Sequence, residues 1–297
     1  MKRVLLVGLI LCLGLLPLTA QATERGLAAY PDGAENFMAG AFPPPGFYFQ
    51  NYLLFYNASR FREHTPPDTN ADLVADVLRF IYSSKVQVFG ANWGMHIVVP
   101  FVYSGIQFKP APISDYQVGV GNISFDPVIL AWHLGDYHIT TGFEFIFPGT
   151  WNHHNPASPS QNYFTFQPVL GLGYLPKCGF GANIKLMYDI PTRNNDPLYL
   201  LAQNSYQSGQ AFHFDYCVDY AVRKDLRIGA AGFYYVQTTA DKADGVTIGN
   251  HGRQFAIGPA IKYDYQRWSF CAITQFEVAT LNRPEGQRYW LRLWYAF

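Results

Sequence analysis

The chain has 297 residues, and its 21 Lys and Arg balance 21 Asp and Glu, so the formal net charge is zero. This balance argues against a basic nucleic-acid-binding protein and against an acidic tail. Charged residues make up only 14% and aromatic residues 17%, while a mean hydropathy of −0.03 is too polar for a bundle of membrane helices. Together these values are typical of a membrane β-barrel, in which lipid-facing and lumen-facing residues alternate.

The first 22 residues have the pattern of a secretory signal peptide. The basic pair Lys2-Arg3 precedes an apolar run over 4–18, and Ala20-Gln21-Ala22 has the A-x-A form of a cleavage site. We therefore expect Sec-type export, cleavage near Ala22 and a mature chain that begins at Thr23. This interpretation favours a protein exported from the cytoplasm of a Gram-negative bacterium.

Three cysteines follow the signal peptide: Cys178, Cys217 and Cys271. Their odd number does not suit a disulfide framework, and their spacing matches no metal site. We expect free thiols that fill small spaces.

Alternating apolar residues mark the end of the chain as a strand. Tyr289, Leu291, Leu293, Tyr295 and Phe297 share one face of it. A final strand of this kind, ending in Phe, resembles the terminal signal of bacterial outer-membrane barrels. We therefore expect the barrel-assembly machinery to be a partner of this protein, and the outer membrane to be its location.

Four further segments carry their charged residues on one face only, opposite an apolar face: 137–147, 183–190, 212–222 and 254–265. A charge on the lipid side at mid-depth costs about 2–4 kcal/mol, so the charged faces are expected to line a polar lumen. A soluble barrel has the reverse arrangement, with its apolar residues inside.

Twelve strands are predicted, joined alternately by short turns and long loops. The strands are 47–57, 71–82, 85–103, 125–133, 137–147, 163–174, 179–190, 207–222, 226–238, 253–265, 268–280 and 288–297. The short turns are 83–84, 134–136, 175–178, 223–225 and 266–267, and the long loops are 58–70, 104–124, 148–162, 191–206, 239–252 and 281–287. Such alternation predicts an all-β, antiparallel transmembrane barrel with both termini in the periplasm.

The weak point of this assignment is the segment 85–103, which is long for one strand. A turn within Gly90-Ala91-Asn92-Trp93-Gly94 would split it and raise the count to thirteen, which breaks the even parity. We favour a single strand with a glycine kink.

Residues 23–46, between the signal peptide (1–22) and the barrel (47–297), show no strand alternation. A flexible periplasmic lead-in is one interpretation. The other is a plug or latch inside the lumen, because Phe37, Met38 and Phe42 offer apolar contacts that free tails rarely carry. A piece of this length would narrow a twelve-stranded pore, whose interior is wider than that of a side-chain-filled eight-stranded barrel.

The candidate site residues are the polar side chains on the predicted inner faces. They are His138, Glu144, Asn183, Lys185, Asp189, His213, Asp215, Asp219, Lys262, Asp264, Gln275, Glu277 and Arg292. One interpretation is that they pair across strands and solvate the lumen. The sharper interpretation is a constriction that selects solutes.

Several segments resemble, in their order along the chain, the outer-membrane family named for the meta-pathway of phenol degradation. They are 30–37, 40–46, Asp126-Pro127, 132–138, 147–151, 194–196, 213–216 and 257–259. The resemblance implies a transporter-like, porin-like barrel, found near the enzymes of aromatic catabolism, that takes up hydrophobic aromatic compounds.

The expected function is passive diffusion of small hydrophobic, in particular aromatic, molecules across the outer membrane. The alternative is a structural or surface-interaction barrel without transport. We expect no cofactor, no metal and no enzyme activity. A barrel phospholipase needs a Ser activated by a His on the lipid face, whereas His138-Ile139-Thr140 has Thr and points inward. The expected partners are outer-membrane lipid and small solutes, and nucleic acid is excluded.

Overall fold

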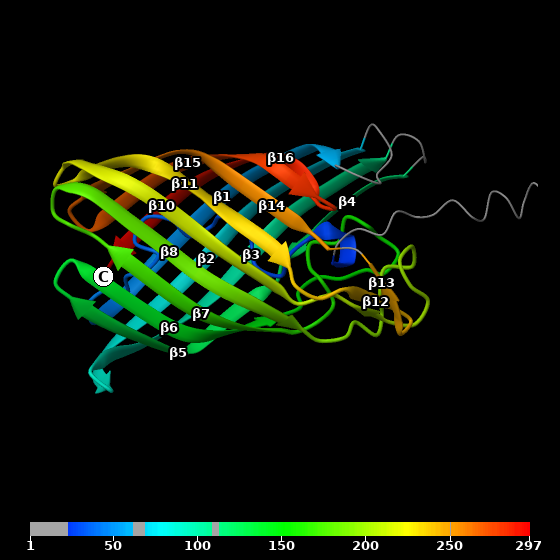
Figure 1. The fold of residues 1–297 in the computed structure, drawn as a ribbon, viewed down its shortest axis with the longest axis horizontal. Helices are drawn as coiled ribbons and strands as arrows, with labels where there is room; N and C mark the ends of the chain where they lie inside the picture. The colour runs from blue at the N-terminus through cyan, green and yellow to red at the C-terminus, as the bar shows by residue number, and fades with distance from the viewer. Residues whose placement is uncertain (1–22, 62–68, 109–112, 250) are drawn as a thin grey trace, which may run out of the picture.

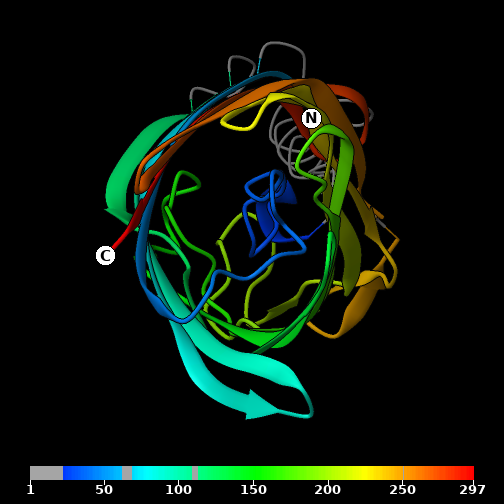
Figure 2. The ribbon, with the colours of Figure 1, turned by 90° about the vertical axis from the view of Figure 1, so that its left-hand side faces the viewer.

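The structure is a computed structural model that describes residues 23–61, 69–108, 113–249 and 251–297. The signal peptide predicted over 1–22 lies outside the described residues. Figures 1 and 2 show one antiparallel β-barrel, with long loops gathered at one end and short turns at the other. These ends are called the loop end and the turn end below. The predicted fold class, an outer-membrane-type barrel, is confirmed.

The described residues place twelve strands side by side in the wall of the barrel. They are β1 (Gly46–Phe61), β2 (Thr69–Val88), β3 (Ala91–Phe108), β5 (Ile123–Leu134), β6 (Tyr137–Phe147), β7 (Thr165–Tyr174), β8 (Gly179–Pro191), β10 (Ala211–Arg223), β11 (Leu226–Gln237), β14 (Arg253–Tyr265), β15 (Trp268–Leu281) and β16 (Pro284–Ala296). Because β1 pairs with both β2 and β16, the ring is closed.

The remaining short elements lie toward the loop end. β4 (Ile113–Val120) pairs with the half of β3 that β5 leaves unpaired, so β4 and β5 share one position in the ring. β9 (Tyr206–Gln207), β12 (Asp241–Ala243) and β13 (Val246–Ile248) form a small separate sheet among the loops. The 3-10 helix η1 (Glu24–Gly26) is a single short turn. No helix among the described residues is long and apolar enough to cross a membrane.

The two faces of the strands carry different residues, as the alternation predicted. On β10, His213 and Asp215 are both 0% exposed on the inside, whereas Val218 is 53% and Tyr220 44% exposed on the outside. On β16, Tyr289 and Leu291 face outward while Trp290 and Arg292 are buried. A wall that is apolar outside and charged inside suits a barrel surrounded by lipid.

Two polar pairs on β1 and β2, Asn51 with Asp76 and Asn57 with Asp72, break this rule on the outside of the wall. Asp76 on β2 is exposed between the inward-facing Ala75 and Val77, and Asn51 on β1 donates a hydrogen bond to its carboxylate. These pairs place carboxylates on the outward face of β2.

The predicted turn at Ser83-Ser84 is wrong, and so is the single strand over 85–103. β2 continues to Val88, and the chain turns at Phe89 and Gly90, which have φ of 51° and 76°. A two-residue hairpin turn with both residues at positive φ follows the twist of its strands. The ladder between β2 and β3 shifts its register between Ser83 and Gln87, so the predicted turn is a bulge within β2. The two errors compensate: the turn lies further along the chain than predicted, but it still separates the same two strands, so the wall still has twelve strands.

Several predicted loops are shorter than expected. The loop 104–124 is largely strand, since β3 continues to Phe108 and β4 returns beside it. The loop 281–287 is a tight connection, because β16 already begins at Pro284. β1 and β2 likewise extend into the predicted loop 58–70. Conversely, β10 begins at Ala211 and not at 207.

Candidate functional site

Residues 23–45, called the lumenal segment below, lie inside the barrel. Figure 2 shows this dark blue stretch within the ring of strands. Tyr30 and Phe37 are buried, and Phe42 packs against Ile81 and Ile129 of the wall. The segment runs from the start of β1 at the turn end to the long loops, so Thr23 lies at the end opposite the C-terminus. The prediction that both termini lie at one end is therefore wrong for Thr23. The even number of strands fixes where the barrel begins and ends, but not the path of a segment that precedes its first strand.

Strand β10 holds the middle of the lumenal segment. The carboxylate of Asp215 accepts the backbone N–H of Gly33 at 2.7 Å and that of Glu35 at 2.9 Å. The Tyr30 hydroxyl donates to the same carboxylate at 3.3 Å. Without Asp215, these three donors would be left without this acceptor if the segment kept its place, and an unpaired buried donor costs free energy.

His213, two residues before Asp215, faces the segment from the same strand. Its Nδ1 lies 3.0 Å from Oδ1 of Asp32, and its Nε2 lies 3.3 Å from Oδ1 of Asp189 on β8. One imidazole therefore links a carboxylate of the segment to a carboxylate of the wall.

Arginines just before and on β16 contact Asp32 of the segment. Arg283 lies 2.8 Å from Oδ2 of Asp32, and Arg288 donates to the Asp32 carbonyl at 2.6 Å. Burial alone would raise the pKa of Asp32, but Arg283 and His213 outweigh it and lower that pKa to about 2. Asp32 is therefore held as a carboxylate.

Glu35, further along the segment, has a similar environment. It forms an ion pair with Arg79 on β2, lies 3.6 Å from Arg292 on β16, and accepts the Tyr52 hydroxyl at 2.7 Å. Burial acts to raise the pKa of Glu35, yet the two arginines lower it to about 2. The segment is thus tied to the wall by charge on both sides.

The loop end covers the beginning of the lumenal segment. Arg25 donates to the carbonyls of Ser158 and Ser160 at 2.6 and 2.5 Å, and Glu24 accepts the amide of Asn194 at 2.8 Å. Burial raises the pKa of Glu24 and lowers the pKa of Arg25. These contacts fix two long loops, 148–164 and 192–210, over the mouth of the barrel.

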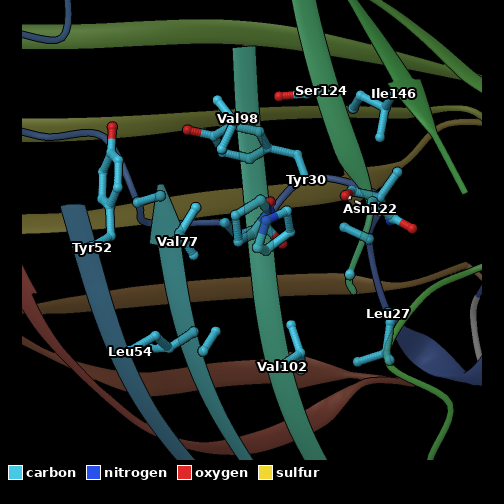
Figure 3. A pocket seen from close by; sticks show the side chains of 18 of the residues that line it. Leu27, Tyr30, Tyr52, Leu54, Val77, Val98, Val102, Asn122, Ser124 and Ile146 are labelled. Carbon is cyan, nitrogen blue, oxygen red and sulfur yellow. Dashed lines mark hydrogen bonds between the residues drawn. The ribbon is translucent and has the colours of Figure 1, made fainter. Parts of the chain in front are cut away.

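A largely apolar cavity of about 180 Å³ lies between the lumenal segment and one side of the wall. Figure 3 shows aliphatic side chains of neighbouring strands pointing into it around the Tyr30 ring. The aliphatic lining residues are Leu27, Leu54, Leu73, Val77, Val98, Val102 and Ile146. Tyr52, Asn122 and Ser124 add hydroxyl and amide groups to the lining. This part of the inner wall is more apolar than the inner face of β10, which carries His213 and Asp215.

A second cavity of about 60 Å³ lies nearer the turn end, beside Phe37 and Phe42. Four residues, called the partition below, line both cavities: Glu35, Arg79, His96 and Lys185. The partition separates an apolar chamber on the loop side from a smaller chamber on the turn side.

The structure places the predicted site residues as follows. Eleven are buried inside the barrel: Glu144, Asn183, Lys185, Asp189, His213, Asp215, Asp219, Lys262, Gln275, Glu277 and Arg292. His138 lies at the turn end with its Nδ1 2.8 Å from that of His133. Asp264 is 40% exposed and pairs with Lys262. Whether these side chains select solutes stays a prediction.

The inward residues fall into separate groups. His213, Asp215, Gln275 and Arg292 hydrogen-bond or pair with the lumenal segment, and Lys185 lies 4.5 Å over the Tyr30 ring. Asp219 pairs instead with Arg227, and Glu277 pairs with Arg288.

Several residues at the centre of the lumen were not among the predicted candidates. They are Asp32, Glu35, Arg79, His96, Asp126, Arg283 and Arg288. A signal existed for Arg79 and His96, since each has the parity of an inward residue on its strand. No periodic signal marked Asp32 and Glu35, because the lumenal segment is not a strand.

Comparison with known proteins identifies the family. Over residues 57–293 the sequence matches the family described as "Putative MetA-pathway of phenol degradation". The chain belongs to this family. The resemblance read from the short sequence motifs is thereby confirmed. None of the curated proteins matches the sequence.

Solved structures resemble the barrel in fold. An outer-membrane channel from Pseudomonas putida F1 superimposes with a TM-score of 0.78 at 11% identity, covering 90% of this chain and 100% of that one. The transport unit of the autotransporter AIDA-I from Escherichia coli gives 0.54 at 9% identity, covering 88% and 96%. The β-domain of the Bordetella autotransporter BrkA gives 0.53 at 8% identity, covering 86% and 100%. At such low identities the similarity establishes the fold.

Proposed function

We propose that this protein is a passive outer-membrane channel for small hydrophobic molecules, in particular those built on one aromatic ring. The observation that carries the proposal is the apolar cavity of about 180 Å³ inside a charged lumen. An engineered protein cavity of about 150 Å³ lined by Leu, Ile and Phe takes up benzene. The cavity in this barrel therefore has the size and the lining for a single ring.

The arrangement of the two chambers supports diffusion without an energy source. Aliphatic walls favour a solute over water by about 25 cal/mol per Å² of apolar surface removed from water. The larger chamber has a largely apolar wall, the smaller one is lined by apolar and polar residues in similar measure, and the partition between them is charged. A solute would bind weakly in each chamber and cross the partition between them. Such a route suits a molecule with little charge of its own.

We propose further that the lumenal segment is the gate of this channel. Its Glu35 is part of the partition and is bound to Arg79 and Arg292. The segment has to shift for a solute to move from one chamber to the other. Its removal is expected to raise ion conductance in planar bilayers, and unchanged conductance would contradict a gating role.

Solute passage is tested by a substitution that fills the cavity with a larger side chain. Val98→Trp places a large side chain in the apolar chamber, while the matched control Ile97→Trp changes the neighbouring residue, which is 40% exposed on the outside. Phospholipid vesicles are themselves permeable to phenol and toluene, so accumulation of labelled phenol is measured in intact cells that lack the wild-type gene. The Val98 variant is expected to lower uptake severalfold and the Ile97 variant to leave it unchanged.

The alternative function is a structural or surface-interaction barrel without transport. The long loops held by Glu24 and Arg25 would then be its working surface. Uptake that does not change on deletion of the whole gene, together with a silent barrel in planar bilayers, would favour this alternative.

A further inference from the structure

Three potential metal ligands meet on neighbouring strands at the side of the partition. His96 on β3, Asp126 on β5 and Glu144 on β6 are all buried, and one ligand atom from each lies within 4.8 Å of the others. Nε2 of His96 is 3.5 Å from Oδ2 of Asp126. His96 and Glu144 line the apolar chamber, and His96 and Asp126 line the smaller one.

An irregularity in β5 brings Asp126 to this place. The ladder between β5 and β6 is interrupted from Phe125 to Ile129, and the ladder between β3 and β5 shifts between Gly94 and His96. Pro127 lies within the interruption and has no N–H to give to a ladder. Bulges of this kind re-aim a side chain and occur next to functional sites.

The two carboxylates are not satisfied by the surrounding protein. Oδ1 of Asp126 and Oε2 of Glu144 are buried and accept no hydrogen bond from the described residues. Lys185 Nζ lies 3.6 Å from Glu144 Oε2, too far for a hydrogen bond, and Arg79 donates to Nδ1 of His96 at 2.9 Å. Burying carboxylate oxygens without partners costs free energy, and such costs concentrate at functional sites.

We propose that His96, Asp126 and Glu144 bind a divalent transition-metal ion, with Zn²⁺ as the representative. One imidazole nitrogen and two carboxylate oxygens suit such ions, whereas Ca²⁺ takes six to eight oxygen ligands and Mg²⁺ prefers an octahedron of oxygens. The remaining positions would be open to water or solute. This site departs from the expectation, drawn from the sequence, that the protein has no metal.

Binding of a metal ion would break two local interactions, that of Arg79 with His96 and that of Lys185 with Glu144. Because Arg79 donates to Nδ1 of His96, the proton of the neutral ring lies on Nε2, facing Asp126. A metal ion bound to Nε2 would require the single proton of the neutral ring to lie on Nδ1 instead. A protonated Nδ1 cannot accept a hydrogen bond, so Arg79 would be released from His96. Arg79 would keep its contacts with Glu35 and Tyr52. Lys185, already 4.5 Å over the Tyr30 ring, would turn away from Glu144.

Zn²⁺ binding to the purified, chelator-treated protein in detergent tests the proposal. The measurements use a background in which the histidine pairs His133/His138 and His153/His154 are replaced by Ala, since their ring nitrogens lie 2.8 Å apart and also attract metal. In this background we expect one Zn²⁺ per chain. Asp126→Asn and Glu144→Gln are expected to lower the affinity by more than the roughly 10- to 100-fold typical of an outer-shell partner.

Two further variants distinguish the site from adventitious binding. Glu277→Gln removes another buried lumenal carboxylate and is expected to leave the affinity unchanged. Lys185→Met removes the positive charge next to Glu144 and is expected to tighten binding severalfold. Circular dichroism and heat-modified gel mobility confirm that each variant is a folded barrel.

The outcomes decide as follows. No Zn²⁺ bound by a folded barrel, or affinity that is the same in the Asp126 and Glu144 variants, would overturn the proposal. A matching loss in both variants, with a gain in Lys185→Met, supports it. Zn²⁺ is also expected to reduce single-channel conductance only where the three ligands are intact. Conductance and phenol uptake without Zn²⁺ report on the channel separately, so the two proposals fail independently.

Discussion

The carboxylate of Asp215 on β10 accepts the backbone N–H of Gly33 at 2.7 Å, although the two residues are 182 positions apart in the chain. Gly33 has a φ of +83° and packs against the side chain of Gln275, where an added Cβ would come within 2.3 Å of Oε1. The lumenal segment is therefore shaped to this strand of the wall, and is not a tail that happens to enter a pore.

Asp215→Ala is expected to loosen the lumenal segment. Three donors lose their acceptor, and each orphaned buried donor costs about 1–3 kcal/mol if the segment stays in place. We expect higher and noisier conductance in planar bilayers. Asp219→Ala is the matched control, because Asp219 lies on the same inner face of β10 but pairs with Arg227. Equal conductance of the two variants would contradict the role of Asp215.

The ion pairs of Asp32 and Glu35 are expected to persist at mildly acidic pH. Both carboxyls have a pKa of about 2, below their ordinary values of 3.8 and 4.5. A lowered pKa contributes stability that is fully present above the ordinary pKa and is lost as the pH falls through the lowered value. The stability difference between wild type and Asp32→Asn, from urea unfolding in vesicles, is expected to shrink between pH 4 and 2, where Asp32 itself becomes protonated. A difference that stays the same between pH 4 and 2 would contradict this assignment.

Phe89→Asn is expected to stabilise the hairpin between β2 and β3. Phe89 is 91% exposed and has a φ of 51°, a left-handed conformation that costs most non-glycine residues about 1–2 kcal/mol. Asn before Gly is the preferred pair for such a turn, and little burial is lost. Urea unfolding should show a gain on the order of 1 kcal/mol. Gly90→Ala, at a φ of 76°, is expected to act in the opposite direction.

Asp244→Ala is expected to free the long loop 192–210 without weakening the barrel. The Asp244 carboxylate accepts the backbone N–H groups of Gln203, Asn204 and Ser205 at 2.9, 2.7 and 2.9 Å. These bonds lower the pKa of Asp244. Limited proteolysis of intact cells is expected to cut the loop faster in the variant. Asp225→Ala, in a short turn at the other end, serves as the control for a lost exposed carboxylate.

The strands and their faces followed from the sequence because the two sides of the wall meet different solvents. On β10 the assignment of His213 inward and Val218 outward needed only the period of two. The hairpin tip was misplaced because Ser83-Ser84 has the composition of a turn and the true turn begins with Phe89. β4 was missed although Tyr116, Val118 and Val120 alternate with polar or small residues.

The centre of the site did not follow from the sequence, because it depends on register. His96 and Asp126 become neighbours only through the shifted ladder between β3 and β5. Glu35 meets Arg79 and Arg292 only because the lumenal segment folds back through the barrel. Phe37 and Phe42 hinted at an apolar contact for this segment, but no local pattern specified its partners in the wall.

The outward-facing pair of Asn51 and Asp76 gives the cylinder a preferred side within the plane of the membrane. A carboxylate facing acyl chains draws water or headgroups toward itself or thins the bilayer beside it. Annular lipid is therefore expected to pack unevenly around the circumference. A neighbouring membrane protein that brings a hydrogen-bond donor to the outer surface along β1 and β2 gains more free energy of association than it would against a purely apolar part of the wall.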